Sequence, residues 1–156
     1  MSRSCNLIVD SCCDLPLELL QSHEGVTIMN FCYILDSTVY PDDFFQTRGV
    51  KEFYDLLRNG AMPTTSQVAP KVLEDTFREA CASGVPTVYL SMSSGVSSNY
   101  SSACMIRDKV KADYPLSELY VVDSLLASTS EGVLVLGAID KMEAGATAKE
   151  LVNWAE

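Results

Sequence analysis

The sequence predicts an α/β domain in which helices flank a mainly parallel β-sheet. Three observations support this fold class. Short runs of β-forming residues alternate with helical patterns, which is the order that produces parallel strands. The apolar runs are nearly continuous, as in strands that are buried on both faces. A chain of 156 residues with 47% hydrophobic content can bury one core of this kind.

The chain begins with a strand, a short helix and a region rich in β-formers. The centre of residues 5–10 is apolar and indicates a buried parallel strand. Asp14 and Pro16 are helix-start signals for a helix over residues 17–21. Valine, isoleucine and aromatic residues over 26–35 predict one or two further strands.

The next segment adds a short strand and two helices around a polar loop. A turn at residues 36–37 leads to a short strand over 38–40. Residues 50–57 place apolar side chains on one helical face, with a glycine just beyond the end. A hydroxyl-rich loop over 63–67 precedes a helix over 70–84, which starts with proline and ends at glycine.

Two more strands and two more helices follow. Residues 87–92 and 119–123 are predicted strands, and a helix over 100–111 lies between them. The pattern Ser128–Glu131 is read as a capping box. The helix that it would start is apolar on nearly every side, so we expect it to be covered on more than one face.

The last residues predict a helix that begins close to the end of the chain. Gly145 ends the preceding helix, and Thr147–Glu150 is a second capping box. The apolar residues that follow, among them Trp154, need a surface to pack against. We therefore expect one α/β domain over residues 1–145, with 146–156 as the start of a helix leading to a second domain that is missing from this chain.

The composition of the chain limits the classes of partner that it is expected to bind. The net charge of −10 argues against nucleic acid and anionic membrane surfaces, which both require clustered basic residues. No apolar run approaches the ~20 residues of a membrane span. The six cysteines show neither CxxC spacing nor histidine neighbours, so no zinc site is evident. The adjacent pair Cys12-Cys13 could form a redox element, but the cysteines are interpreted as small, mostly buried side chains in a reducing compartment. A soluble cytoplasmic protein is therefore expected.

Polar residues collect where the predicted strands end. Asp10-Ser11, the loop 93–99 and Asp123-Ser124 all follow strands, and ligands of parallel sheets lie at that edge. Hydroxyl groups are dense in residues 91–102 and again in 63–67. Because hydroxyls and helix N-termini offer hydrogen-bond donors, we predict a site for a phosphate or a carboxylate here.

The sequence lacks the residues that hydrolysis and nucleotide binding usually require. His23, the only histidine, is expected at the surface beyond the first helix, and no Gly-x-Ser-x-Gly elbow occurs. Phosphate-loop and dinucleotide-binding glycine motifs are missing too. Five acidic residues could in principle hold Mg²⁺, but they are read mostly as caps and turns: Asp10, Asp14, Asp42, Asp43 and Asp123. We expect no catalytic residue, cofactor or metal.

Motifs spread over almost the whole chain resemble the DegV family of fatty-acid-binding proteins. They are Ile8-Val-Asp-Ser11, Asp14-Leu-Pro16, Tyr40-Pro-Asp42, Phe53-Tyr54, Thr65-Ser-Gln67, Leu90-Ser-Met-Ser-Ser-Gly-Val-Ser97 with Tyr100 and Ser102-Ala103, and Val122-Asp-Ser124. The resemblance implies a two-domain bacterial protein that buries a long-chain fatty acid in a tunnel. Members of this kind are acyl-carrying subunits that present the carboxylate to the ATP-binding subunit of a fatty acid kinase, for acyl-phosphate formation.

The same resemblance implies a set of site residues. Thr65 and Ser97 would donate hydrogen bonds to the carboxylate, and Ser66 and Ser94 would support the loop geometry. The family's Gly-Thr pair after the key serine is Ser98-Asn99 here. Asn99 can still donate a hydrogen bond. Candidate tunnel-lining residues, each with core packing as the alternative, are Phe31, Tyr33, Ile34, Phe44 and Phe45.

Two other interpretations remain open at this point. One is a metal-dependent enzyme that acts on a small phosphorylated substrate at the same edge, with Asp10 and Asp123 as essential residues. The other is an interaction module without a ligand, in which the serines only cap helices and turns. The carrier interpretation instead predicts that replacing Thr65 and Ser97 abolishes retention of a carboxylate ligand while the fold survives.

Overall fold

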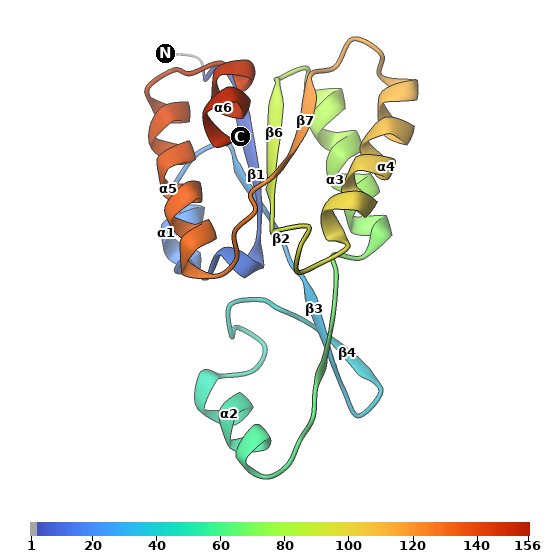
Figure 1. Ribbon diagram of the computed structural model, residues 1–156, viewed down its shortest axis with the longest axis vertical. Helices are drawn as coiled ribbons and strands as arrows, with labels where there is room; N and C mark the ends of the chain where they lie inside the picture. The colour runs from blue at the N-terminus through green and yellow to red at the C-terminus, as the bar shows by residue number, and fades with distance from the viewer. Residues whose placement is uncertain (1–2) are drawn as a thin grey trace.

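The computed structural model describes residues 3–156 and contains a four-stranded parallel sheet between two layers of helices (Figure 1). The strand order is β2-β1-β6-β7. Their bounds are Asn6–Asp10 for β1, Val26–Met29 for β2, Thr87–Ser91 for β6 and Leu119–Asp123 for β7. The fold class predicted from the sequence is therefore confirmed.

The two faces of this sheet bury different helices because side chains alternate along each strand. Leu7 and Val9 belong to a core with α1, α5 and α6, whereas Ile8 faces a second core with α3 and α4. The helices are α1 (Leu17–Gln21), α3 (Pro70–Ser83), α4 (Asn99–Asp113), α5 (Thr129–Glu143) and α6 (Ala148–Ala155). None of the described helices is long and apolar enough to cross a bilayer.

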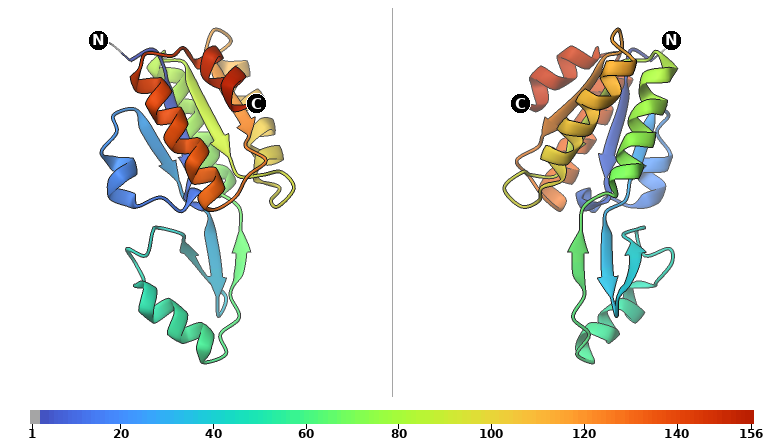
Figure 2. Two further views of the ribbon diagram at one scale, coloured as in Figure 1. Left: turned by 60° about the vertical axis from the view of Figure 1, so that its left-hand side comes forward. Right: turned by 90° about the vertical axis from the view of Figure 1, so that its right-hand side faces the viewer.

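A second, smaller sheet stands beyond the carboxyl edge of the first, as Figure 2 shows. It is antiparallel, in the order β4-β3-β5, and is accompanied by helix α2. The bounds are Cys32–Leu35 for β3, Thr38–Pro41 for β4, Val50–Arg58 for α2 and Thr64–Ser66 for β5. The β-rich region 26–35 thus contributes one strand to each sheet.

The prediction of a loop over 63–67 is wrong for its centre, which is strand β5. All three residues of β5 are exposed, so no hydrophobic alternation marks the strand. Its structure comes from backbone pairing with β3, in which Thr65 lies opposite Tyr33. Backbone pairing of this kind depends on a partner that is distant in sequence, which a local pattern does not reveal.

Several helix ends follow the sequence and others do not. Gly84 ends α3 in the left-handed region (φ 70°), and Thr147 starts α6 with a complete capping box, both as predicted. The start signal assigned to Asp14 is wrong, because this residue (φ 52°) ends a short 3-10 helix over Ser11–Cys13. Pro16 precedes α1 without a side-chain cap.

The expectations for α5 and α6 also need correction. Ser128 does not cap α5, because its hydroxyl donates to the carboxylate of Asp14 (2.6 Å), and Glu131 is fully buried. Only one face of α5 is covered within the described residues, and Val133 is 71% exposed. The apolar residues of α6 were expected to need a surface to pack against. Leu151 packs within this domain, in the core beside the sheet.

Candidate ligand-binding site

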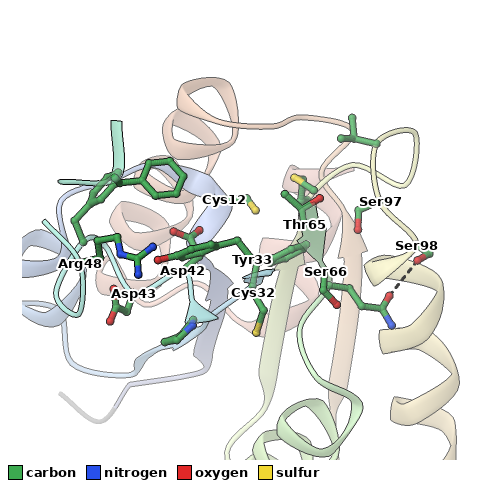
Figure 3. A pocket seen from close by; sticks show the side chains of 17 residues that line it. Cys12, Cys32, Tyr33, Asp42, Asp43, Arg48, Thr65, Ser66, Ser97 and Ser98 are labelled. Carbon is green, nitrogen blue, oxygen red and sulfur yellow. Dashed lines mark hydrogen bonds between the residues drawn. The ribbon is translucent and has the colours of Figure 1, made fainter. Parts of the chain in front are cut away.

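A cavity lies where the carboxyl edge of the main sheet meets the small sheet. Its volume is about 580 Å³, which is within the range of small-molecule sites. The small sheet, the segment 41–53 and the loop between β6 and α4 line it. Figure 3 shows Arg48 and Tyr33 toward one side of the cavity and Ser97 on the other.

Aromatic rings form one part of the wall. Phe31, Tyr33, Phe45 and Phe53 all line the cavity. The ring of Phe53 meets Tyr33 edge-on, with centroids 5.4 Å apart, and Tyr33 stacks on Tyr40 at 5.3 Å. Because such contacts favour fixed ring positions, this part of the cavity presents a preformed apolar surface.

Arg48 places one cation in the same wall. Its guanidinium carbon lies 4.6 Å from the centroid of the Tyr40 ring, and its Nε lies 3.3 Å from the carboxylate of Glu52. Both contacts compensate the charge, the first as a cation–π interaction. Arg48 therefore extends the aromatic surface with its side chain, while its Nη1 is buried without a hydrogen-bond partner among the described residues.

Hydroxyl groups form the other part of the wall. Thr65 and Ser66 come from β5, and Ser97 comes from the loop before α4. A hydrogen bond from the Ser98 hydroxyl to Gln67 Oε1 (3.1 Å) ties this loop to the end of β5 (Figure 3). The two hydroxyl-rich segments identified in the sequence therefore meet at one cavity, although they belong to different sheets.

The hydroxyl group of Ser97 is free to donate its proton in a hydrogen bond. Its oxygen accepts a hydrogen bond from the backbone N–H of Asn99 (3.1 Å), and no described residue accepts its proton. A serine hydroxyl has one proton and two lone pairs. The proton of Ser97 is consequently available to an acceptor inside the cavity.

Two of the candidate residues do not line the cavity. Ser94 is exposed, and its backbone N–H donates to Asp123 (3.0 Å). Asn99 is fully buried, and its amide nitrogen donates to the Tyr89 hydroxyl (2.7 Å) and to Ser91 Oγ (3.1 Å). Asn99 therefore contributes to the site indirectly. It lies beneath the loop, and its backbone N–H donates a hydrogen bond to the oxygen of Ser97.

The tunnel candidates divide in the same way. Phe31, Tyr33 and Phe45 line the cavity, whereas Ile34 and Phe44 do not. Ile34 is next to Tyr33 on strand β3, so its side chain points to the opposite face. Phe44 packs instead against the core that contains α5. Its neighbour Phe45 reaches the cavity because both residues have a left-handed backbone (φ about 60°).

Asp42 and Cys12 were missed as wall residues. Asp42, interpreted as part of a solvated turn, is half-buried and accepts a hydrogen bond from Ser11 Oγ (2.7 Å). Ser11 Oγ in turn accepts from the backbone N–H of Phe31 (3.1 Å). Burial raises the pKa of the Asp42 carboxyl and, more strongly, that of the Cys12 thiol. Asp42 belongs to the Tyr40-Pro-Asp42 motif, which gave no sign of a place in the wall, and Cys12 belongs to no motif; the fold brings both residues to the cavity.

The acidic residues at the strand ends accept hydrogen bonds from backbone N–H groups. Asp10 is fully buried and accepts bonds from two backbone N–H groups and one tyrosine. Burial opposes ionisation of Asp123, but hydrogen bonds from Ser94 and Leu125 outweigh it and lower the pKa of its carboxyl. Among residues 3–156 no three metal-ligating side chains converge. His23 lies outside the cavity, with Nδ1 2.6 Å from Glu143 Oε1.

Comparison with known proteins identifies relatives of the whole chain. The family model described as "Uncharacterised protein, DegV family" matches residues 4–156. A DegV domain-containing protein of Clostridium perfringens is 30% identical over 150 residues, which cover 96% of this chain and 51% of the relative. The chain thus spans about half the length of the curated relatives it matches.

Solved structures resemble the fold over nearly the whole chain. A stearic acid-binding protein from Eubacterium ventriosum has 26% identity and a TM-score of 0.86 over 97% of this chain and 52% of its own. A DegV family protein from Thermus thermophilus, described for its fatty acid binding, has 27% identity and a TM-score of 0.78. That match covers 99% of this chain and 52% of the other.

Proposed function

The chain belongs to the DegV family, and from this premise we propose that it binds a long-chain fatty acid in the cavity between its two sheets. The observation that carries the proposal is the division of one cavity into an aromatic part and a hydroxyl part. A fatty acid has the same division, with an apolar chain and one carboxylate. The similarity to two proteins described as binding fatty acids supports the assignment.

In this proposal Thr65 and Ser97 donate hydrogen bonds to the carboxylate. Ser66 lines the same wall, whereas Ser94 and Asn99 support the loop from outside the cavity. Burial of each methylene group stabilises the complex by roughly 0.8 kcal/mol, so the aromatic part supplies most of the affinity. The hydroxyl groups fix the orientation of the acid.

We further propose that the protein is a carrier subunit and not an enzyme that acts alone. Hydroxyl donors hold a carboxylate without changing it, so acyl-phosphate formation would require the ATP-binding subunit of a fatty acid kinase. A second domain beyond residues 146–156 belongs to the same proposal, because the curated relatives are about twice as long. We place this function in the cytoplasm, where the six free cysteines would remain reduced.

The proposal is tested by measuring stearate binding to the purified chain. Calorimetry gives the affinity, and mass spectrometry of a solvent extract identifies the bound acid. Replacing Thr65 by Val and Ser97 by Ala should each weaken binding by about 10-fold to 100-fold, because each removes about 1.5–3 kcal/mol of charge-assisted hydrogen bonding. The matched control is Ser101→Ala, on the exposed side of α4. Full retention of stearate by the double variant would contradict the assignment of the carboxylate site.

A further inference from the structure

Tyr89 is a fully buried tyrosine whose hydroxyl group lies within a network of polar groups. It belongs to β6, the strand between β1 and β7, and its ring packs against Phe77 with centroids 6.0 Å apart. The hydroxyl donates to the carboxyl group of Asp10 (3.1 Å), which also accepts from the backbone N–H groups of Cys12 and Met92. A buried hydroxyl is costly unless it is hydrogen-bonded, so this bond fixes where the tyrosine oxygen lies.

The oxygen of Tyr89 is the acceptor for the side chain of Asn99. Tyr89 has one proton, which it gives to Asp10, so the 2.7 Å contact with Asn99 Nδ2 is a hydrogen bond donated by the amide. The second proton of Nδ2 goes to Ser91 Oγ (3.1 Å). Asn99 Oδ1 is buried and accepts no hydrogen bond from a described residue. The side chain of Asn99 is therefore held through its nitrogen, by two acceptors on the same face of β6.

Asn99 is also the first residue of α4, and its backbone contacts Ser97. The first N–H groups of a helix have no partner within the helix, and Ser98, which precedes α4, provides no side-chain cap. The N–H of Asn99 donates instead to Ser97 Oγ (3.1 Å). The position of the Ser97 hydroxyl thus depends on the start of α4, and the buried amide of Asn99 holds the start of α4 against β6.

We propose that Tyr89 is a positioning residue for the Ser97 hydroxyl and acts through Asn99. While the amide is bonded to β6, the N–H of Asn99 keeps the Ser97 oxygen in place and leaves the hydroxyl proton for an acceptor in the cavity. Without the Tyr89 hydroxyl, the amide loses the shorter of its two hydrogen bonds. The inference rests on the proposed function only in assigning Ser97 to a fatty-acid carboxylate.

Two substitutions separate this role from a general contribution to stability. Tyr89→Phe removes the acceptor for the amide and keeps the buried ring. Asn99→Leu has a similar size and keeps the backbone N–H, but it has no side-chain donor, and it leaves the bond between Tyr89 and Asp10 intact. The matched control is Tyr120→Phe on β7, which removes a hydroxyl that bonds to Glu118 at the surface (2.8 Å).

Hydrogen exchange measured by nuclear magnetic resonance on the ligand-free chain tests the hydrogen-bond order. In Tyr89→Phe and in Asn99→Leu, the backbone N–H of residue 99 should exchange about tenfold faster than in the wild type, because this end of the loop opens more easily. The amides of β6 and β7 should keep their protection, and Tyr120→Phe should match the wild type. Unchanged exchange at residue 99, or equally faster exchange throughout the sheet, would overturn the proposal.

Stearate binding then tests the link to the cavity through a double-mutant cycle. Tyr89→Phe and Asn99→Leu should each weaken binding about threefold to tenfold, as for one neutral hydrogen bond. In a Ser97→Ala background neither change should weaken binding further, because the hydroxyl that they position is gone. Unchanged affinity in Tyr89→Phe, or a loss that multiplies with that of Ser97→Ala, would overturn the positioning role. The expected exchange in a chain that binds no stearate would uphold the hydrogen-bond order and overturn the proposed function instead.

Discussion

Replacing Glu131 by glutamine should change how the stability of the protein depends on pH. In the folded protein, burial and the neighbouring Asp10 raise the pKa of Glu131 from 4.5 to about 9. In the unfolded chain this carboxyl is exposed and regains its ordinary pKa. Between these two pH values the folded state holds a proton that the unfolded state has released, so the free energy of unfolding falls as the pH rises.

The size of the effect follows from the two pKa values. Each pH unit between them lowers the free energy of unfolding by about 1.4 kcal/mol. At pH 7, about 2.5 units above the unfolded pKa of Glu131, the loss amounts to about 3 kcal/mol. This is a large share of the ~5–15 kcal/mol by which domains are stable. Glutamine cannot ionise, so its variant should not show this loss.

Urea unfolding followed by circular dichroism at pH 5, 6, 7 and 8 measures the difference. The slope of that difference against pH is the decisive quantity, because an unpartnered amide oxygen at position 131 has the same cost at every pH. The advantage of Glu131→Gln should grow by about 1.4 kcal/mol per unit. Glu79→Gln, at an exposed position, should follow the wild type. Parallel curves for Glu131→Gln and the wild type would refute the reasoning.

Two further predictions concern packing and helix capping. Gly132→Ala should lower the free energy of unfolding by about 1–3 kcal/mol, because the new Cβ would lie 2.5 Å from the carbonyl oxygen of Cys13. Gly49→Ala meets nothing within 4 Å and should cost less than about 1 kcal/mol, so equal losses in the two variants would contradict the packing argument. Thr147→Ala should cost about 1 kcal/mol in the same urea assay, because it removes the capping box with Glu150; an unchanged midpoint would show that the cap is dispensable.

The elements of the main sheet were predictable because their signals are local. Residues 87–92 and 119–123 are apolar runs of strand length, and the structure has β6 and β7 there. Pro70 and Gly84 mark the two ends of α3 through properties of their own backbones. Such signals need no information about the rest of the chain.

Glu131 shows where local signals mislead. Its place three residues after Ser128 satisfies the capping-box pattern, yet Ser128 has φ 57° and bonds to Asp14 instead. The carboxyl of Glu131 turns inward to Asp10 because β1 lies beside the start of α5 in the folded sheet. The sequence holds no sign of this pairing, since the two residues are more than a hundred positions apart.

By itself the sequence determined the fold class, the family and the two hydroxyl-rich segments, because repeated patterns and ordered motifs are properties of neighbouring residues. Only the tertiary structure decided which of those hydroxyls share a cavity: Thr65 and Ser97 meet there, while Asn99 is buried beneath the loop. It also brought Asp42 and Arg48 into the wall. The physical reason is that a site is made by strand pairing and burial between distant segments, whose energies depend on contacts that form only in the folded chain.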